Sequence, residues 1–87
     1  MTINDCIRAA YKSRIEDAGT RAALRDEVLP RLESEAEELR TLRLYMHRKG
    51  HAAEWRKDGF YHDEAVTRRA IQIARFRLRT VPLTIRA

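Results

Sequence analysis

Apolar residues recur at spacings of three and four along most of the chain, which is the pattern of amphipathic helices. The first run predicts a helix over about 3–18, with Thr2 as N-cap, Asp5 as its capping-box partner and Gly19 as the stop. Further runs predict helices over about 21–48 and 64–80, and a short helix over 51–57. The chain is therefore expected to fold as an all-α protein.

The second predicted helix has a heptad-like apolar seam that contains one carboxylate. Its members are Leu24, Val28, Leu32, Glu35, Leu39, Leu42 and Met46. Pro30 falls within this helix and lacks a backbone donor, so we expect a bend there or a restart with Pro30 near the first turn. Lys49 and Gly50 are expected to end the helix.

The length of 87 residues predicts one helical domain over 1–80. The residue before a proline disfavours the helical conformation, so Val81 and Pro82 are expected to end the last helix and leave 81–87 as an extended tail. A helix over 21–48 would be about 42 Å long, whereas a compact domain of this size is only about 30 Å across. We therefore expect that helix to bend, and two chains to pack together as a homodimer.

Charge is divided unevenly along the chain. Residues 1–38 have 6 basic and 9 acidic side chains, whereas residues 39–87 have 12 basic and 4 acidic ones. Fifteen of the 18 basic residues are arginine, whose planar guanidinium suits carboxylate and phosphate. This distribution predicts a partner that presents negative charge to the C-terminal half.

The last predicted helix places three arginines in one stripe. On a helical wheel Arg68, Arg75 and Arg79 lie close together with Gln72 between them, opposite the apolar residues. Arg48, Lys49, Arg56 and Lys57 could extend this surface, interleaved with the aromatic residues Trp55, Phe60 and Tyr61 as a stacking platform. The alternatives are a solvated helix face for the arginines and a small core for the aromatic residues.

Arg77 differs from these arginines because it falls within the apolar side of the wheel. A buried arginine needs a partner, since an unpaired charge in the core costs several kcal/mol. Glu35 is the matching exception on the seam of the second helix. We predict that the two form a structural ion pair, the alternative being that Glu35 faces solvent.

The sequence offers little for catalysis or metal binding. Cys6 is the single cysteine and is expected to be a small buried residue; one cysteine and the lack of a leader or spanning segment favour a cytoplasmic protein. His47 and His51 are four residues apart, but Gly50 interrupts the helix between them, so no metal and no cofactor are expected. Adjacent carboxylates such as Asp63 and Glu64 are interpreted either as a solvated polar surface or as helix-start charge.

Together these features predict a non-catalytic protein-interaction module, a small adaptor or inhibitor, whose basic half binds an acidic protein surface. The alternative is a DNA- or RNA-binding protein that uses the arginine stripe. Neither a membrane nor a small-molecule substrate is expected. Small basic helical proteins are common among accessory factors of phages and mobile elements, which is an analogy of size and class rather than of motif.

Overall fold

The computed structural model describes the backbone of residues 1–86 and the side chains of residues 1–79. Its helices are α1 (Ile3–Lys12), α2 (Ala18–Ala23), α3 (Leu29–Arg48), α4 (Ala52–Lys57) and α5 (Phe60–Arg86). A π-helical turn, Leu24–Val28, joins α2 to α3. No strand occurs in the described part of the chain, so the all-α prediction is confirmed.

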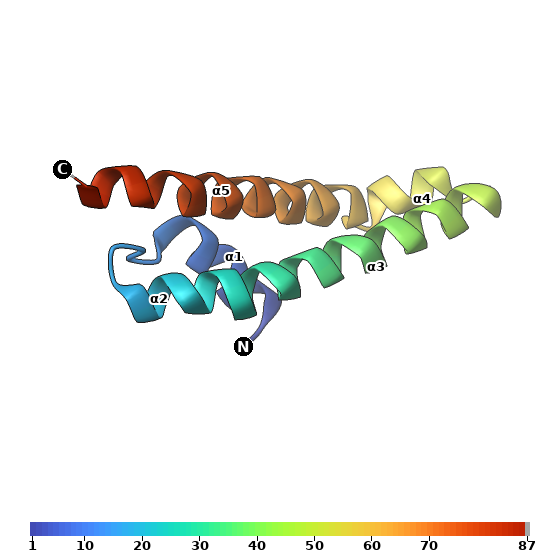
Figure 1. Cartoon of the computed structure of the whole chain (residues 1–87). Helices are drawn as coiled ribbons and strands as arrows, with labels where there is room; N and C mark the ends of the chain where they lie inside the picture. Colours follow the sequence, from blue (N-terminus) through green and yellow to red (C-terminus); the bar gives the residue numbers. More distant parts are fainter. Residues whose placement is uncertain (87) are drawn as a thin grey trace.

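The helices form an elongated molecule of 54 × 22 × 16 Å. Figure 1 shows α2 and α3 as one long helical path with α5 running alongside it in the opposite direction. α1 packs against both α3 and α5 near one end, and α4 lies at the other end. The long helices therefore extend well beyond the part of the molecule that α1 covers, which fits the length argument from the sequence.

The core lies where α1, the π-helical turn, α3 and α5 meet. Its buried members are Cys6, Ala10, Ile15, Leu24, Val28, Leu32, Ala70, Ile71 and Ala74. Leu39 of α3 and Trp55 of α4 are buried outside this cluster. The small side chains at 10, 70 and 74 let α1 and α5 approach closely, which suits a core built from few large residues.

The first helix is shorter than predicted. Thr2 and Asp5 form the predicted capping box, but α1 ends at Lys12 rather than near residue 18. Asp17 then caps α2, and its carboxylate accepts hydrogen bonds from Thr20 N at 2.9 Å and Thr20 Oγ1 at 2.8 Å. This cap starts a new helix at Ala18, so Gly19 lies inside a helix instead of ending one.

Pro30 is the second residue of α3, as the restart alternative predicted. The proline ring crowds the carbonyl four residues earlier and supplies no donor of its own. The chain accommodates this with the π-helical turn, in which Leu29 N–H donates to the Leu24 carbonyl five residues back. The helical path thus continues from Ala18 to Arg48 without a loop.

Two glycines separate the remaining helices. Gly50 has φ +82°, and the amides of Gly50 and His51 donate to the carbonyls of His47 and Met46, which is a Schellman ending for α3. Gly59 has φ +86°, and α5 begins directly after it at Phe60, four residues before the predicted start. The short helix predicted over 51–57 is confirmed as α4.

The tail prediction is wrong for residues 81–86, because α5 continues to Arg86; Ala87 lies outside the described residues. The bias against helix before a proline is a preference and not a prohibition. A helix that is already many turns long can accept one missing donor at Pro82, whereas a short segment could not.

Arg77 ties α5 to the end of α1. Its guanidinium donates to the Ala10 carbonyl at 2.7 Å and to the Ser13 carbonyl. These carbonyls belong to the last turn and the C-cap of α1, where the helix dipole favours a cation. Glu35 lies 3.3 Å from Arg31 on its own helix, and its pair with Arg77 stays a prediction.

A first prediction concerns the Asp17 cap. The Thr20 hydrogen bonds hold the pKa of Asp17 below its ordinary value. The stabilisation is therefore present above about pH 4 and is lost as the pH falls through the lower pKa of the folded state. Asp17→Ala should lower the melting temperature at neutral pH, and the difference from wild type should shrink in acid. Glu16→Ala serves as the control, and a pH-independent difference for Asp17→Ala would contradict the cap.

A second prediction separates the two roles considered for Arg77. Arg77→Leu keeps the apolar stem but leaves two α1 carbonyls without their charged donor, which should cost about 1.5–3 kcal/mol of unfolding free energy. Glu35→Ala removes only a partly exposed pair and should cost less than about 1 kcal/mol. Urea unfolding measures both values. Equal, large losses in the two variants would instead support an Arg77–Glu35 pair.

Candidate functional site

The exposed side of α5 is strongly cationic. From Ala65 to Arg79 every charged side chain on this helix is an arginine. Four of these arginines are exposed, and two other exposed residues lie among them. We call this surface the cationic face; it consists of Arg68, Arg69, Gln72, Arg75, Phe76 and Arg79. The structure thus places the predicted stripe on the exposed side of α5, while its role in binding stays a prediction.

A groove of about 400 Å³ runs between this face and α3. Its floor contains the apolar side chains of Ala36 and Ile71, and its rims contain charged residues of both signs. The rim residues are Glu33, Glu37, Arg40, Arg68, Gln72 and Arg75. The groove is therefore lined by three guanidinium groups and two carboxylates above an apolar floor.

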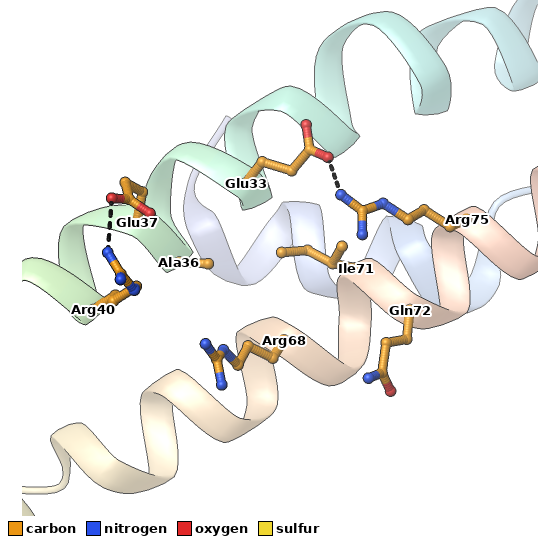
Figure 2. Close-up of a pocket in the computed structure, with 8 residues that line it drawn as sticks. All are labelled: Glu33, Ala36, Glu37, Arg40, Arg68, Ile71, Gln72 and Arg75. Atoms are coloured by element: carbon orange, nitrogen blue, oxygen red, sulfur yellow. Dashed lines mark hydrogen bonds and ion pairs between the residues drawn. The ribbon is translucent and has the colours of Figure 1, made fainter.

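Two of the arginines that line the groove form ion pairs with glutamates of α3. Arg75 Nη2 lies 2.5 Å from Glu33 Oε2, and Arg40 Nη1 lies 3.5 Å from Glu37 Oε1. Figure 2 shows the Glu33–Arg75 pair across the groove, the Glu37–Arg40 pair along α3, and Gln72 pointing away from α3. An acidic ligand in this groove would have to displace Glu33 to reach both donors of Arg75. The arginines toward solvent, Arg69 and Arg79, have no such ion pair among the described side chains.

The carboxylate of Glu64 is buried at the interface of α3 and α5. The residue is only 6% exposed, and its oxygens accept from Arg43 Nε at 3.0 and 3.3 Å. Arg68 Nε lies 3.8 Å from the same carboxylate. Glu64 therefore links the two long helices and holds one arginine of the cationic face. Its interpretation as a helix-start charge was wrong, because α5 begins four residues earlier.

Sequence reasoning missed two residues of this region, and both had a detectable signal. Glu64 lies three and seven residues before Thr67 and Ile71, which are buried on the same side of α5. A carboxylate that lies on the buried side of a helix needs a basic partner, because an unpaired buried charge is costly. Phe76 is 57% exposed and lies among the arginines, although its type favours burial. On the helical wheel Phe76 lies beside Arg69, and this position indicated that Phe76 is exposed.

The basic residues near α4 form a separate group. Arg48, Lys49, Arg56 and Lys57 are exposed, but α4 lies at one end of the molecule whereas α5 runs away from it (Figure 1). The helix rise is about 12 Å from Phe60 to Arg68, the near end of the arginine stripe, and about 28 Å to Arg79, its far end. The contribution of these residues to binding stays a prediction.

The aromatic residues of this end do not form an exposed stacking platform. Trp55 is only 1% exposed, and its ring stacks on Phe60 with centroids 5.3 Å apart. Tyr61 is exposed but lies under a cation, because the Arg56 guanidinium is 4.9 Å from its ring centroid. Trp55 thus closes a small apolar cluster, which is the core alternative considered for it, and its ring is not free to stack on a base.

The remaining titratable groups take part in local structure. His47 Nδ1 lies 2.8 Å from the Arg43 carbonyl, and His51 Nδ1 lies 3.8 Å from Glu54. In the described part of the chain no three His, Cys, Asp or Glu residues are placed to hold a metal ion. Burial raises the pKa of the Cys6 thiol, the charge of Asp5 adding only a smaller effect, so this cysteine is a poor nucleophile.

Among the helices that the structure describes, none has the length and apolar content needed to cross a bilayer. Comparison with family models, curated proteins and solved structures finds no match to the chain. The surface chemistry of α3 and α5 is therefore the basis for assigning a function.

A third prediction tests the buried carboxylate. Glu64→Ala leaves Arg43 and Arg68 without their shared partner, and it should cost about 2–4 kcal/mol of unfolding free energy because Arg43 is itself partly buried. The control, Glu37→Ala, breaks an exposed pair with Arg40 and should cost less than about 1 kcal/mol. Chemical denaturation gives both numbers. Similar small losses in the two variants would mean that Glu64 reaches water in solution.

Proposed function

We propose that the chain is a non-catalytic interaction module whose cationic face binds an acidic surface of a partner protein. The observation that supports this most directly is the composition of that face. Four exposed arginines surround Phe76 and Gln72, and no carboxylate belongs to α5 beyond Glu64 in the described residues. Arginine and aromatic side chains are the residues most enriched at the centres of protein interfaces.

Phe76 gives this face an apolar centre as well as charge. An aromatic side chain that is 57% exposed can fill an apolar pocket of a partner while the arginines around it pair with carboxylates. Guanidinium groups bind carboxylates through two parallel hydrogen bonds, which adds direction to the contact. The partner is accordingly a surface with an apolar depression rimmed by Asp and Glu.

Two observations favour a protein over nucleic acid as the partner. Trp55 is buried and so is withdrawn from base stacking. The carboxylates of Glu33 and Glu37 line the groove beside the arginines, where they would repel a continuous phosphate backbone more than a surface with discrete charges. A nucleic-acid partner is therefore the rival outcome of the experiment below.

A fourth prediction tests the face through capture. A photo-crosslinking residue in place of Gln72 should trap an acidic protein from lysate of the source cells, with or without nuclease treatment. Adding Arg68→Gln, Arg75→Gln and Arg79→Gln should weaken binding to the purified partner by about 10–100-fold while leaving the helical spectrum unchanged. A matched control, Arg8→Gln with Arg14→Gln and Arg25→Gln, removes the same charge from exposed sites elsewhere and should leave binding nearly unchanged.

Two outcomes would contradict the proposal. Unchanged affinity in a folded triple variant would show that the arginines of α5 form an ordinary solvated surface. Loss of capture after nuclease treatment, with binding to duplex or single-stranded probes that falls steeply with salt, would assign the face to nucleic acid.

A further inference from the structure

The side of α3 that faces away from α5 has an unusual composition for a solvated helix surface. A hollow of about 610 Å³ lies along it, lined by Ser34, Glu37, Glu38, Thr41, Leu42 and Tyr45. Tyr45 is 53% exposed, and Leu44 beside it is 43% exposed. The contacts of α3 with α5 are made from another side of the helix, through residues such as Ala36 and Arg43. The Lys49 ammonium lies 5.8 Å from the centroid of the Tyr45 ring, and the ring still remains more than half exposed.

Polar and apolar residues on this side follow a heptad-like row. Ser34, Glu38, Thr41, Tyr45 and Arg48 are separated by 4, 3, 4 and 3 residues, so they form one stripe along α3. We call this row the α3 stripe. Glu38 and Arg48 lie at equal distances on either side of residue 43, and each is exposed with no ion pair among the described side chains.

We infer that the α3 stripe is the contact surface between two copies of this chain, packed antiparallel about a two-fold axis near residue 43. A two-fold interface must be complementary to itself, so that residue i meets residue j and j meets i. The stripe has this property, because the antiparallel arrangement brings Glu38 opposite the second copy's Arg48 at both ends and Thr41 opposite Tyr45 in the middle.

Other arrangements of two copies lack this complementarity. A parallel pairing through the same stripe would place Glu38 against Glu38 and Arg48 against Arg48, which is repulsive. Pairing through the cationic face would oppose four exposed arginines on each side without a carboxylate on that part of α5. The antiparallel α3 contact is the one in which opposite charges meet and the exposed tyrosine is covered.

This inference is independent of the proposed function, because it concerns α3 and leaves the cationic face of α5 open.

A fifth prediction follows, and a charge exchange tests it. Sedimentation velocity at high micromolar concentration should show a dimer for the wild-type chain. Glu38→Arg and Arg48→Glu should each raise the dissociation constant by about tenfold or more, because each change turns two symmetric attractions into repulsions. An equimolar mixture of these two variants should form a heterodimer, since one contributes two arginines and the other two glutamates. The double variant should dimerise like the wild type.

The controls make the same charge changes away from the stripe. Glu16→Arg and Arg14→Glu lie in the segment between α1 and α2, and they should leave the dimer unchanged. Circular dichroism should show that each variant keeps its helical content. A wild-type monomer at high micromolar concentration would overturn the inference, as would a dimer that persists in both single variants or one that the mixture fails to restore.

Discussion

The alignment of the two long helices depends on a carboxylate that lies out of water. Glu64 of α5 lies in the α3–α5 interface and accepts hydrogen bonds from Arg43 of α3. Arg68, one turn further along α5, lies close to the same carboxylate. A shift of α5 by one residue in its register against α3 would turn this carboxylate away from Arg43. The partly buried guanidinium of Arg43 would then have no partner. Apolar packing between helices tolerates small shifts, whereas a buried charge pair has few acceptable positions. The positions of the other α5 arginines follow from this fixed register.

The same residue type therefore has two kinds of role along α5. Arg77 closes the end of α1 by donating to its carbonyls, and it belongs to the folded framework. Arg68 and Arg75 are held on one side by glutamates, yet their side chains remain largely exposed. Such partial restraint orients a guanidinium and lowers the entropy that a partner must remove on binding. Arg69 and Arg79 have no such restraint among the described side chains, so they remain free to adapt to a ligand.

Much of the fold was accessible from periodicity, and the errors have local causes. The spacing of apolar residues identified the helices because burial on one side dominates their stability, and glycine marked the end of α3 at Gly50. The end of α1 was not accessible, because a remote arginine and the Asp17 cap decide it. The carbonyl acceptors of Arg77 were not accessible for a related reason. A pattern can show that a buried cation needs acceptors, but backbone carbonyls of another helix serve as well as a carboxylate, and sequence position does not distinguish them. The exposed side of α5 was predictable, whereas the partial neutralisation by Glu33 depends on the distance between helices.

The exposed sides of α3 and α5 lie on different sides of one narrow molecule, and this has a consequence for valency. Two chains joined through α3 would form a flat layer whose cationic faces lie at its outer margins. Such an object is bivalent, so a target with repeated acidic sites would be bound at two points at once. Its apparent affinity would then exceed that of one face by the effective concentration of the second. A dimer whose single faces bind weakly would then dissociate slowly from a target with repeated acidic sites. It would dissociate quickly from a target with only one such site.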